Sequence, residues 1–454
     1  MSLLPFVSVI LPVRNEAAFI AETLRAVLAQ DYAAERVEVI VVDGMSEDGT
    51  RDIVQRLAAR DPRLSILDNP GRIAPAALNL GIRAVRGEVI LRVDGHGILP
   101  PNYLRECVAW LEAEDAAWKA ESRKQKAETC PRGNVEDVER RIEDRGRMAE
   151  DAGQRAEGKA QCAFSLRLDR GEGRGEVSLP SARPSVALLA VGGAWDCVGS
   201  GLVGRAIALA AGSSFGVGNA AYRTSRPSEK PLCTDSVPFW VMRREVFERI
   251  GLFREEMLCH EDYELNYRLR LAGGRILLLP WLRSVYRVRP TLAALCRQYG
   301  RYGFWKGRFL RSHPGSLRLR HFVPPLFVLA LAMTVAGSLF NPIALRCFGA
   351  LVGLYGVFLL VATLLLAASR GRSRHAQHPC HGAQASRPEA ARGASVAAPG
   401  SPDSAAPRLD ASTPFLSFVL VPVVLAAIHL CWGTGVWLGL ARGPVPGQPP
   451  KLAA

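Results

Sequence analysis

The stretch Gly87-Glu-Val-Ile-Leu-Arg-Val-Asp-Gly-His96 contains an apolar run, residues 89–93, which predicts a buried β-strand. The run stops at Asp94, and His96 follows two positions later. Mg²⁺ and Mn²⁺ prefer oxygen ligands and Mn²⁺ also accepts an imidazole nitrogen, so this strand end is a candidate site for a cation and a diphosphate. An Asx turn, in which Asp94 caps its own backbone and Gly95 supplies the backbone conformation, explains the same residues. The stretch alone leaves both interpretations open.

The chain before this stretch alternates between strand and helix patterns. Helices are expected over about residues 16–29, 46–60 and 74–85, and they separate strands expected at residues 7–12, 37–43, 64–68 and 89–93. This alternation predicts an α/β domain with a parallel sheet that helices cover on both faces. Ligands of such sheets bind beyond the carboxyl ends of the strands, where the sequence has Arg14-Asn15-Glu16, Asp43 and Asp94-Gly95-His96.

The first strand ends in Pro12-Val-Arg-Asn-Glu16, a turn without the closely spaced glycines of a dinucleotide-binding motif or a P-loop. This composition argues against NAD or FAD, and its charged and amide side chains suit recognition of a nucleoside. Asp43, at the end of the second strand, is placed to accept hydrogen bonds from a base or a ribose. It can also serve in helix capping beside Ser46, and the two roles are compatible.

A second group of polar residues is Cys259-His-Glu-Asp-Tyr-Glu-Leu265. The spacing of leucines from Tyr263 onward predicts a helix with one buried face, and Glu261 and Asp262 fall in its first turn. Carboxylates are favoured there by the helix dipole, which is a structural explanation. The functional explanation is that one of them is a general base, which requires that the fold bring it near Asp94.

Three apolar segments, residues 322–340, 347–368 and 415–440, are long enough to cross a bilayer, which takes roughly 20 residues. Buried core helices are the alternative. Just before them, Arg297-Gln-Tyr-Gly-Arg-Tyr-Gly-Phe-Trp-Lys306 interleaves aromatic and cationic residues, which is typical of a helix at a membrane surface, with or without a catalytic role. The arginines near these segments favour an anionic membrane surface.

Composition limits the remaining choices. The 454 residues carry a formal net charge of +14, but no motif of the RNA- or DNA-binding kinds accompanies it, so nucleic acid is not expected as a partner. The 10 cysteines form no C-x-x-C pair, and the N-terminus has no signal-peptide pattern, so we expect a cytosolic catalytic domain. Residues 113–185 are highly charged and read as a solvated, partly disordered insertion, with a docking arm as the alternative. Residues 369–413 read as a disordered basic loop.

In order along the chain, these motifs resemble family 2 glycosyltransferases of the GT-A fold, and within them the membrane glucosyltransferases of succinoglycan-biosynthesis type. The resemblance rests on Pro12-Val-Arg-Asn-Glu16, Val41-Val-Asp-Gly-Met-Ser-Glu-Asp-Gly-Thr50, Asp94-Gly-His96, Thr234-Asp-Ser-Val-Pro-Phe239, His260-Glu-Asp-Tyr-Glu-Leu265 and Gln298-Tyr-Gly-Arg-Tyr-Gly-Phe-Trp-Lys306. It covers about residues 6–112 and 186–320. Residues 1–112 would be the nucleotide-sugar half of one domain and residues 186–290 its acceptor half. Residues 291–321 would be an interfacial segment. Two spans (322–368), the basic loop and a third span (414–441) would follow.

The resemblance implies a nucleotide-diphospho-sugar donor, a UDP-sugar above all, and an inverting transfer with Mn or Mg as the cofactor. It implies that Asp43 contacts the uridine and that Asp262, beside Glu261, is the catalytic base. The other donor-binding residues would be Pro12, Arg14, Glu16, Ser46, Arg72 and Asp94. The metal ligands would be Asp94 and His96. The residues that contact the acceptor or the diphosphate would be Gln298, Arg301, Tyr302 and Trp305. His96 stands where the family has a second Asp, which leaves the identity of the metal open. Tyr302 stands where Trp is usual in a motif that often accompanies polymerising synthases, and this departure weakens a processive interpretation.

The sequence therefore predicts a multi-pass enzyme of the inner membrane that transfers a sugar to a polyprenyl-linked saccharide during exopolysaccharide or cell-surface glycan synthesis. Two alternatives remain at this point. One is a processive polysaccharide synthase, for which three spans are few. The other is a non-catalytic membrane scaffold with the same fold.

Overall fold

The computed structural model describes residues 4–129, 189–316, 318, 321–375 and 415–445. The chain divides into two compact units, Met1–Leu111 with Leu188–Ala454, and Glu112–Ala187. Helix α4 (Tyr103–Thr129) begins in the first unit and enters the second. Most of the predicted insertion and of the predicted basic loop lies outside the described residues.

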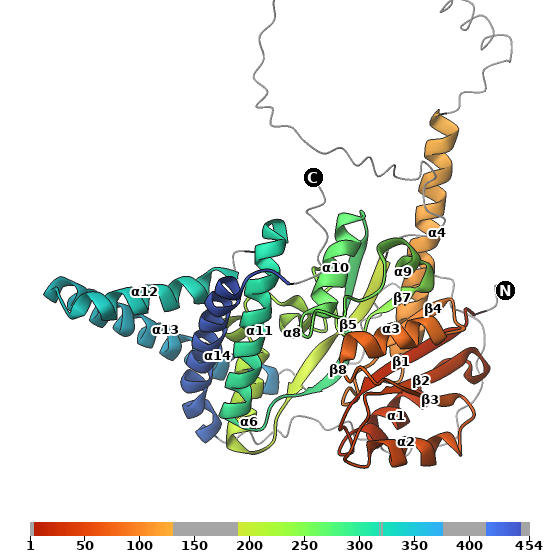
Figure 1. Ribbon diagram of the computed structural model, residues 1–454, viewed down its shortest axis with the longest axis horizontal. Helices are drawn as coiled ribbons and strands as arrows, with labels where there is room; N and C mark the ends of the chain where they lie inside the picture. The colour runs from red at the N-terminus through yellow and green to blue at the C-terminus, as the bar shows by residue number, and fades with distance from the viewer. Residues whose placement is uncertain (1–3, 130–188, 317, 319–320, 376–414, 446–454) are drawn as a thin grey trace, which may run out of the picture. The chain divides into compact units, whose positions relative to one another are not determined.

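The N-terminal half of the sheet is parallel, as predicted. Strand β1 (Val7–Val13) pairs with β2 (Val37–Asp43) and with β4 (Val89–Arg92), and β2 pairs with β3 (Leu64–Asp68). Helices α1 (Ile20–Leu28) and α2 (Thr50–Ala58) cover one face and α3 (Ala74–Ala84) covers the other (Figure 1). The strands are continuous apolar runs because both faces are buried, and their carboxyl ends meet at one edge.

The second half of the sheet is mixed. Strand β7 (Val241–Arg243) is antiparallel to both β4 and β5 (Leu189–Val198), and it joins the two halves in the order β3-β2-β1-β4-β7-β5-β8-β6. The remaining elements before the C-terminal helices are η1 (Ala34–Arg36), α6 (Gly201–Ala211), α7 (Ser214–Val217), α8 (Ala221–Thr224), β6 (Leu232–Cys233), α9 (Arg244–Ile250), α10 (Glu261–Leu271) and β8 (Arg275–Arg287).

Among the described residues, the helices that follow the sheet are α11 (Leu292–Ser312), α12 (Val323–Ser338), α13 (Pro342–His375) and α14 (Phe415–Arg442), with the short η2 (Pro314–Ser316) after α11. By length and composition, two stretches of them could cross a membrane, Pro342–Ser369 and Leu416–Arg442. The predicted first span forms α12, whose 16 residues cover about 24 Å, less than the roughly 30 Å of a bilayer core. Helix α12 is therefore not among the described helices that are long enough to cross a membrane, and a span at this segment stays a prediction. The helix ends before Pro342, which cannot continue it and instead opens α13.

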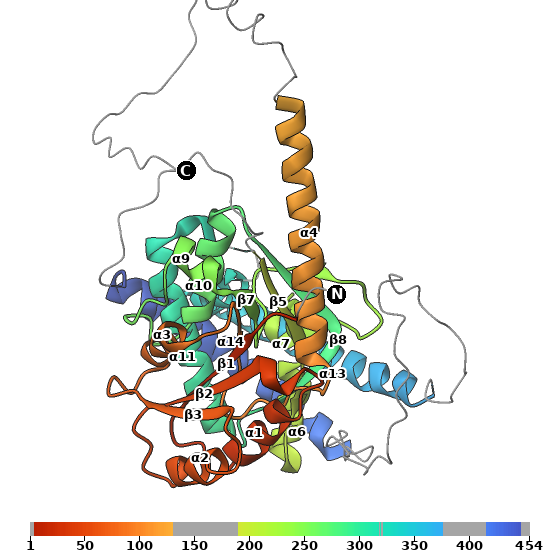
Figure 2. The same ribbon diagram turned by 90° about the vertical axis from the view of Figure 1, so that its right-hand side faces the viewer.

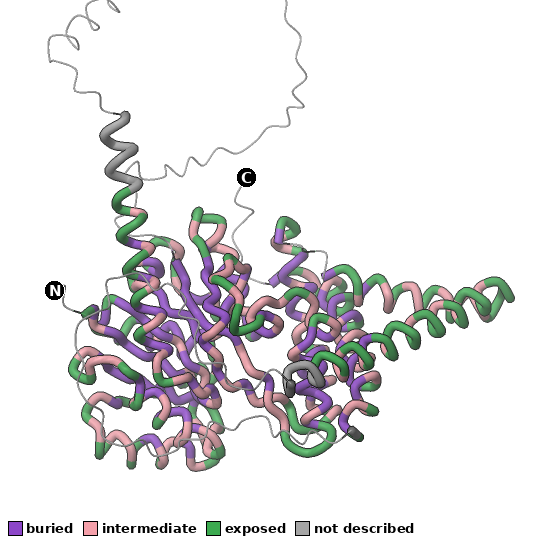
Figure 3. Tube along the Cα trace, turned by 180° about the vertical axis from the view of Figure 1, so that it is seen from behind, coloured by how far each residue is buried: buried purple, intermediate pink, exposed green. Residues whose placement is uncertain are grey.

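Helices α12 and α13 pack against each other, and many of the exposed large apolar side chains of the described residues lie on them. Figure 3 shows this pair as the mostly green and pink arm, in contrast to the buried strands of the sheet. Helix α14 differs because one of its sides is buried against α6, through Val421, Leu425 and Ile428.

Helix α11, predicted to lie at a membrane surface, is packed side by side with α14 (Figure 2). Glycines make this approach possible: a Cβ at Gly303 would lie 2.2 Å from the carbonyl oxygen of Trp432, and one at Gly439 would lie 2.0 Å from that of Phe304. At the end of α14, Arg311 donates a hydrogen bond to the carbonyl oxygen of Leu440 (2.6 Å). The C-terminal helix is thus part of the packing of the catalytic unit.

Candidate active site

A pocket of about 270 Å³ lies at the carboxyl ends of the parallel strands. Six residues of the predicted site line it: Pro12, Arg14, Glu16, Arg72, Asp94 and His96. The lining also includes Asn69 and Arg92, which were not predicted as site residues. The ends of β1 and β4 expected from the sequence therefore meet at one cavity, whereas Asp43, at the end of β2, is not part of its lining.

The turn after β4 places Asp94 and His96 at this pocket. It is closed by a main-chain hydrogen bond from Gly97 to Asp94 (2.9 Å), while the Asp94 side chain accepts a bond from Arg92. Gly95 is required there because a Cβ would lie 2.9 Å from Cγ of Glu16. Nδ1 of His96 is 2.9 Å from Oε1 of Glu16. Burial opposes a charge on His96, but the bond to Glu16 and the charge of Asp94 outweigh it and raise the pKa of His96.

The residues at this turn fit a divalent-cation site in which substrate phosphates would supply the remaining ligands. Among the described residues no cluster of three or more His, Cys, Asp or Glu side chains could hold a metal by itself. Cations of the Mg²⁺ type, however, are commonly held by one or two carboxylates together with substrate phosphates. Asp94 offers an oxygen, and the hydrogen bond at Nδ1 fixes the ring of His96 so that Nε2 remains as the potential ligand.

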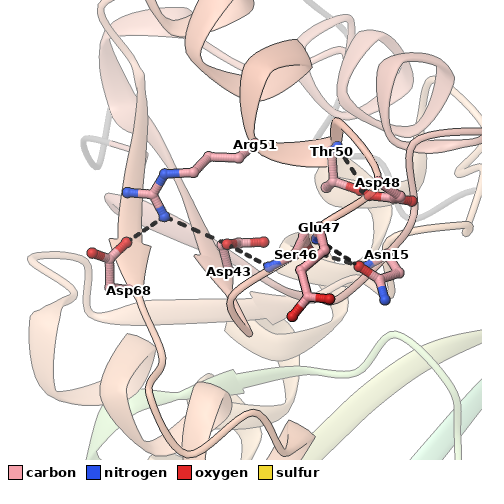
Figure 4. A network of polar contacts seen from close by, with 8 residues as sticks. All are labelled: Asn15, Asp43, Ser46, Glu47, Asp48, Thr50, Arg51 and Asp68. Carbon is pink, nitrogen blue, oxygen red and sulfur yellow. Dashed lines mark hydrogen bonds and ion pairs between the residues drawn. The ribbon is translucent and has the colours of Figure 1, made fainter.

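Asp43 directly precedes Gly44 of the pocket lining and belongs to the polar network of Figure 4, and its side chain is 1% exposed. Its Oδ2 accepts from the Ser46 amide (3.1 Å) and from Arg51 (3.4 Å), whereas its buried Oδ1 has no hydrogen-bond partner among the described residues. Ser46 itself accepts a bond from the amide of Asn15, so it supports the turn after β1. A buried, unpaired carboxylate oxygen beside a pocket is what a polar ligand would satisfy.

Ser46 does not cap the following helix, which corrects one detail of the sequence interpretation. Helix α2 begins at Thr50, where Asp48 accepts the Thr50 amide (3.0 Å) and Gly49 has a φ of 90°.

Backbone strain is concentrated around the site. The non-glycine residues with positive φ in the described chain are Asn15, Met45, Arg72, Phe239 and His260. The first three follow the ends of β1, β2 and β3, and the last directly precedes Glu261. Such conformations persist where surrounding contacts impose them, and they are common at functional sites.

Arg92 joins this pocket to the second predicted group. Its guanidinium is 3.1 Å from Oδ1 of Asp94 and 3.2 Å from Oε1 of Glu261, at the start of α10. Burial opposes the charge of Arg92, but the charges of Asp94, Glu261 and Asp262 raise its pKa. Burial raises the pKa of Glu261 to about 7, although Arg92 acts in the opposite direction. The fold thus brings Asp94 and the Glu261–Asp262 pair together.

His260 connects the same helix start to α11. Its Nε2 lies 2.9 Å from the carbonyl oxygen of Tyr302, and because a carbonyl only accepts, Nε2 carries the proton. Burial and the charge of Lys306 lower the pKa of His260 to about 4, so the ring is neutral at physiological pH.

The four predicted residues of α11 are not all brought to the site. Gln298 is buried and donates to the hydroxyls of Tyr286 (3.2 Å) and Tyr302 (2.9 Å). The ring of Tyr286 lies 6.5 Å from that of His96, so Gln298 and Tyr302 connect with the pocket. Arg301 is exposed and is not part of the pocket lining, and Trp305 is buried in an apolar cluster with Met257 and Phe309.

Arg92 was the main residue that sequence reasoning missed. A signal was present, because an arginine inside a buried apolar strand must find acidic partners in the fold. The identity of those partners could not be read, since Glu261 is 169 positions away.

Comparison with known proteins agrees with this geometry. Residues 8–149 match the family "Glycosyl transferase family 2". This match assigns a family 2 glycosyltransferase domain to that part of the chain. Together with the observed sheet, this confirms the expected GT-A type of α/β fold and identifies the chain as a glycosyltransferase.

Two of three similar proteins cover more of the chain than the family match does. Succinoglycan biosynthesis protein ExoA of Rhizobium meliloti is 27% identical over 340 residues, which are 73% of this chain and 77% of that protein. An undecaprenyl-phosphate 4-deoxy-4-formamido-L-arabinose transferase of Pseudomonas syringae is 30% identical over 129 residues, 25% of this chain and 38% of that protein. A mannosyltransferase of Pyrobaculum calidifontis, solved in complex with GDP-Man and Mn²⁺, is 22% identical and covers 81% of this chain and 87% of that one, with a TM-score of 0.46.

Proposed function

We propose that this chain is a membrane-anchored inverting glycosyltransferase. It moves a sugar from a nucleotide-diphospho-sugar to a lipid-linked saccharide in the synthesis of an exopolysaccharide or another cell-surface glycan. The observation that supports this proposal is the contact of Arg92 with both Asp94, which lines the pocket, and Glu261, the neighbour of Asp262.

A UDP-sugar is the proposed donor. The unpaired Oδ1 of Asp43 would accept a hydrogen bond from the uracil or the ribose. Pro12, Arg14 and Glu16 would frame the nucleoside, with Ser46 supporting that turn and Arg72 at the rim of the pocket.

Asp94 and His96 would hold Mn or Mg against the diphosphate, with Glu16 orienting the His96 ring. When bound, the cation stabilises the negative charge that develops on the leaving diphosphate.

Asp262 is the proposed general base, removing the proton from an acceptor hydroxyl that attacks on the face opposite the diphosphate. Such an attack inverts the anomeric carbon. Glu261, held by Arg92, fixes the start of α10 and therefore the place of Asp262. Gln298 and Tyr302 of α11 would lie on the acceptor side, whereas the exposed Arg301 and the buried Trp305 would support the helix and its surroundings.

The acceptor is proposed to be a saccharide on a polyprenyl carrier. Two of the described helices are long and apolar enough to cross a membrane, and α14 packs directly on α11, so an acceptor anchored in lipid would be presented close to the site. A relative named for transfer to undecaprenyl-phosphate supports this choice. We propose the inner membrane as the location, with the catalytic domain in the cytosol.

The test is incubation of membranes containing the full chain with a panel of radiolabelled nucleotide sugars, with Mn²⁺, with Mg²⁺ or with EDTA. We expect label to enter the lipid fraction with one UDP-sugar and only with a cation. Asp262→Asn should abolish transfer and leave donor binding nearly unchanged, because the base acts on the acceptor proton.

Asp52→Asn is the matched control, since Asp52 is exposed on α2, and it should transfer at the wild-type rate. Full activity of Asp262→Asn would refute the assignment of the base. A ladder of long products on a gel, rather than one added sugar, would support a processive synthase.

A further inference from the structure

Arg92 is the last residue of β4, and its backbone amide is bonded to the carbonyl oxygen of Trp240 (3.1 Å). This bond and the pairing of β4 with β7 fix the origin of the side chain in the centre of the sheet. From there the guanidinium reaches two carboxylates on different parts of the chain. Both Nε and Nη2 are 3.1 Å from Oδ1 of Asp94, and Nη2 is also 3.2 Å from Oε1 of Glu261.

The side chains of Arg92 and Glu261 are largely shielded from water, each 12% exposed, and that of Asp94 is partly shielded, at 28%. Charged hydrogen bonds in such surroundings are short and directional. Removal of one member leaves the others buried without compensation, so the arrangement of the three is strongly interdependent.

We propose that Arg92 is a positioning residue that couples the donor pocket to the base: it holds Glu261 against Asp94 and thereby sets Asp262 relative to the donor. This inference rests on the proposed transfer at this site. Arg92 lines the pocket, so a bound donor and the start of α10 contact the same guanidinium. Occupation of the pocket then orders the helix that carries the base.

The planar fork of arginine is needed for this role. A lysine keeps the charge but presents a single ammonium group, which cannot bond Asp94 and Glu261 in the same geometry. Arg92→Lys therefore separates positioning from charge. Arg268→Lys is the control for general damage to α10, because Arg268 makes a comparable buried pair with Glu264 (2.8 Å) on the same helix.

Kinetics give the first test, with the donor that turns over in the panel. We expect Arg92→Lys to lower kcat by about 10–100-fold, as small displacements of a catalytic group do. The dissociation constant of UDP should change by less than about 3-fold, since the donor contacts of the other lining residues remain. The double variant Arg92→Lys with Glu261→Gln should be no slower than the slower single variant, because both changes break one linkage.

Hydrogen exchange gives a second test that does not need turnover. UDP with Mn²⁺ should slow amide exchange in a peptide covering residues 260–265 of the wild type and of Arg268→Lys, but not of Arg92→Lys. The proposal is overturned if Arg92→Lys keeps the wild-type kcat or UDP protects this peptide equally in it. It is also overturned if the effects of Arg92→Lys and Glu261→Gln multiply. A wild type that orders this peptide on UDP but transfers no sugar would refute the proposed function and leave the coupling standing.

Discussion

The packing of α14 on α11 leads to a quantitative prediction at Gly303. A Cβ at this position would lie 2.2 Å from the carbonyl oxygen of Trp432 and 3.0 Å from the Val436 amide. Ordinary contacts between such atoms begin near 3.4 Å, so Gly303→Ala forces the two helices apart by about 1 Å. Gly300, one turn earlier on α11, provides the matched control because its Cβ would be 3.9 Å from the nearest atom, the Cys431 carbonyl oxygen.

The expected difference in the free energy of unfolding between the two variants follows from two opposing effects. Replacing a glycine by alanine inside a helix stabilises it by about 1 kcal/mol, and this gain applies equally to both positions. Overpacking costs about 1–3 kcal/mol, and it applies to Gly303 alone. The folded state of Gly303→Ala should therefore be about 1–3 kcal/mol less stable than that of Gly300→Ala, with the wild type between them or near the lower value.

The assay is thermal unfolding of the purified full chain in one detergent, with the two variants and the wild type measured side by side. We expect the Tm of Gly303→Ala to fall a few degrees below that of Gly300→Ala. Transfer activity should fall with it, because α11 also carries Gln298 and Tyr302. Equal Tm values for the two variants, or a higher value for Gly303→Ala, would refute the close contact between α11 and α14.

Two further predictions concern the site. Burial raises the pKa of Glu261 from 4.5 to about 7, so between these pH values the folded protein holds a proton that the unfolded chain releases. The resulting contribution to the free energy of unfolding is fully present below the pKa of the unfolded chain, and it is lost as pH rises through 7. Glu261→Gln should flatten the decline of Tm between about pH 5 and 8; a slope equal to that of the wild type contradicts the raised pKa. Asp43→Asn should weaken UDP binding about 10–100-fold in calorimetry, because hydrogen bonds to a charged acceptor contribute about 1.5–3 kcal/mol. The control is Asp68→Asn, at a half-exposed carboxylate, which should bind UDP nearly as well as the wild type. Equal affinities of the two variants would exclude Asp43 from nucleotide binding.

The donor half of the site could be predicted from local patterns. Strands β2 and β3 have the expected bounds, and the polar residues that follow the strands lie at one edge because parallel strands share their direction. The acceptor half depended on contacts between distant segments. The spacing of Gln298, Arg301, Tyr302 and Trp305 predicts one helical face, but their surroundings differ along the helix. Gln298 bonds the hydroxyls of Tyr286 and Tyr302, whereas Arg301 is exposed and Trp305 is buried in an apolar cluster, and these surroundings come from segments distant in sequence.

The sequence by itself determined the α/β class, the edge of the sheet where polar residues gather, and the apolar character of the C-terminal segments. These properties depend on periodicity and on the chemistry of neighbouring residues, which short-range physics controls. Only the tertiary structure decided that Arg92 meets Glu261 across 169 positions, that α12 ends after 16 residues, and that glycines let α14 pack on α11. Such contacts depend on how the chain closes into one core, and that closure is a property of the whole fold.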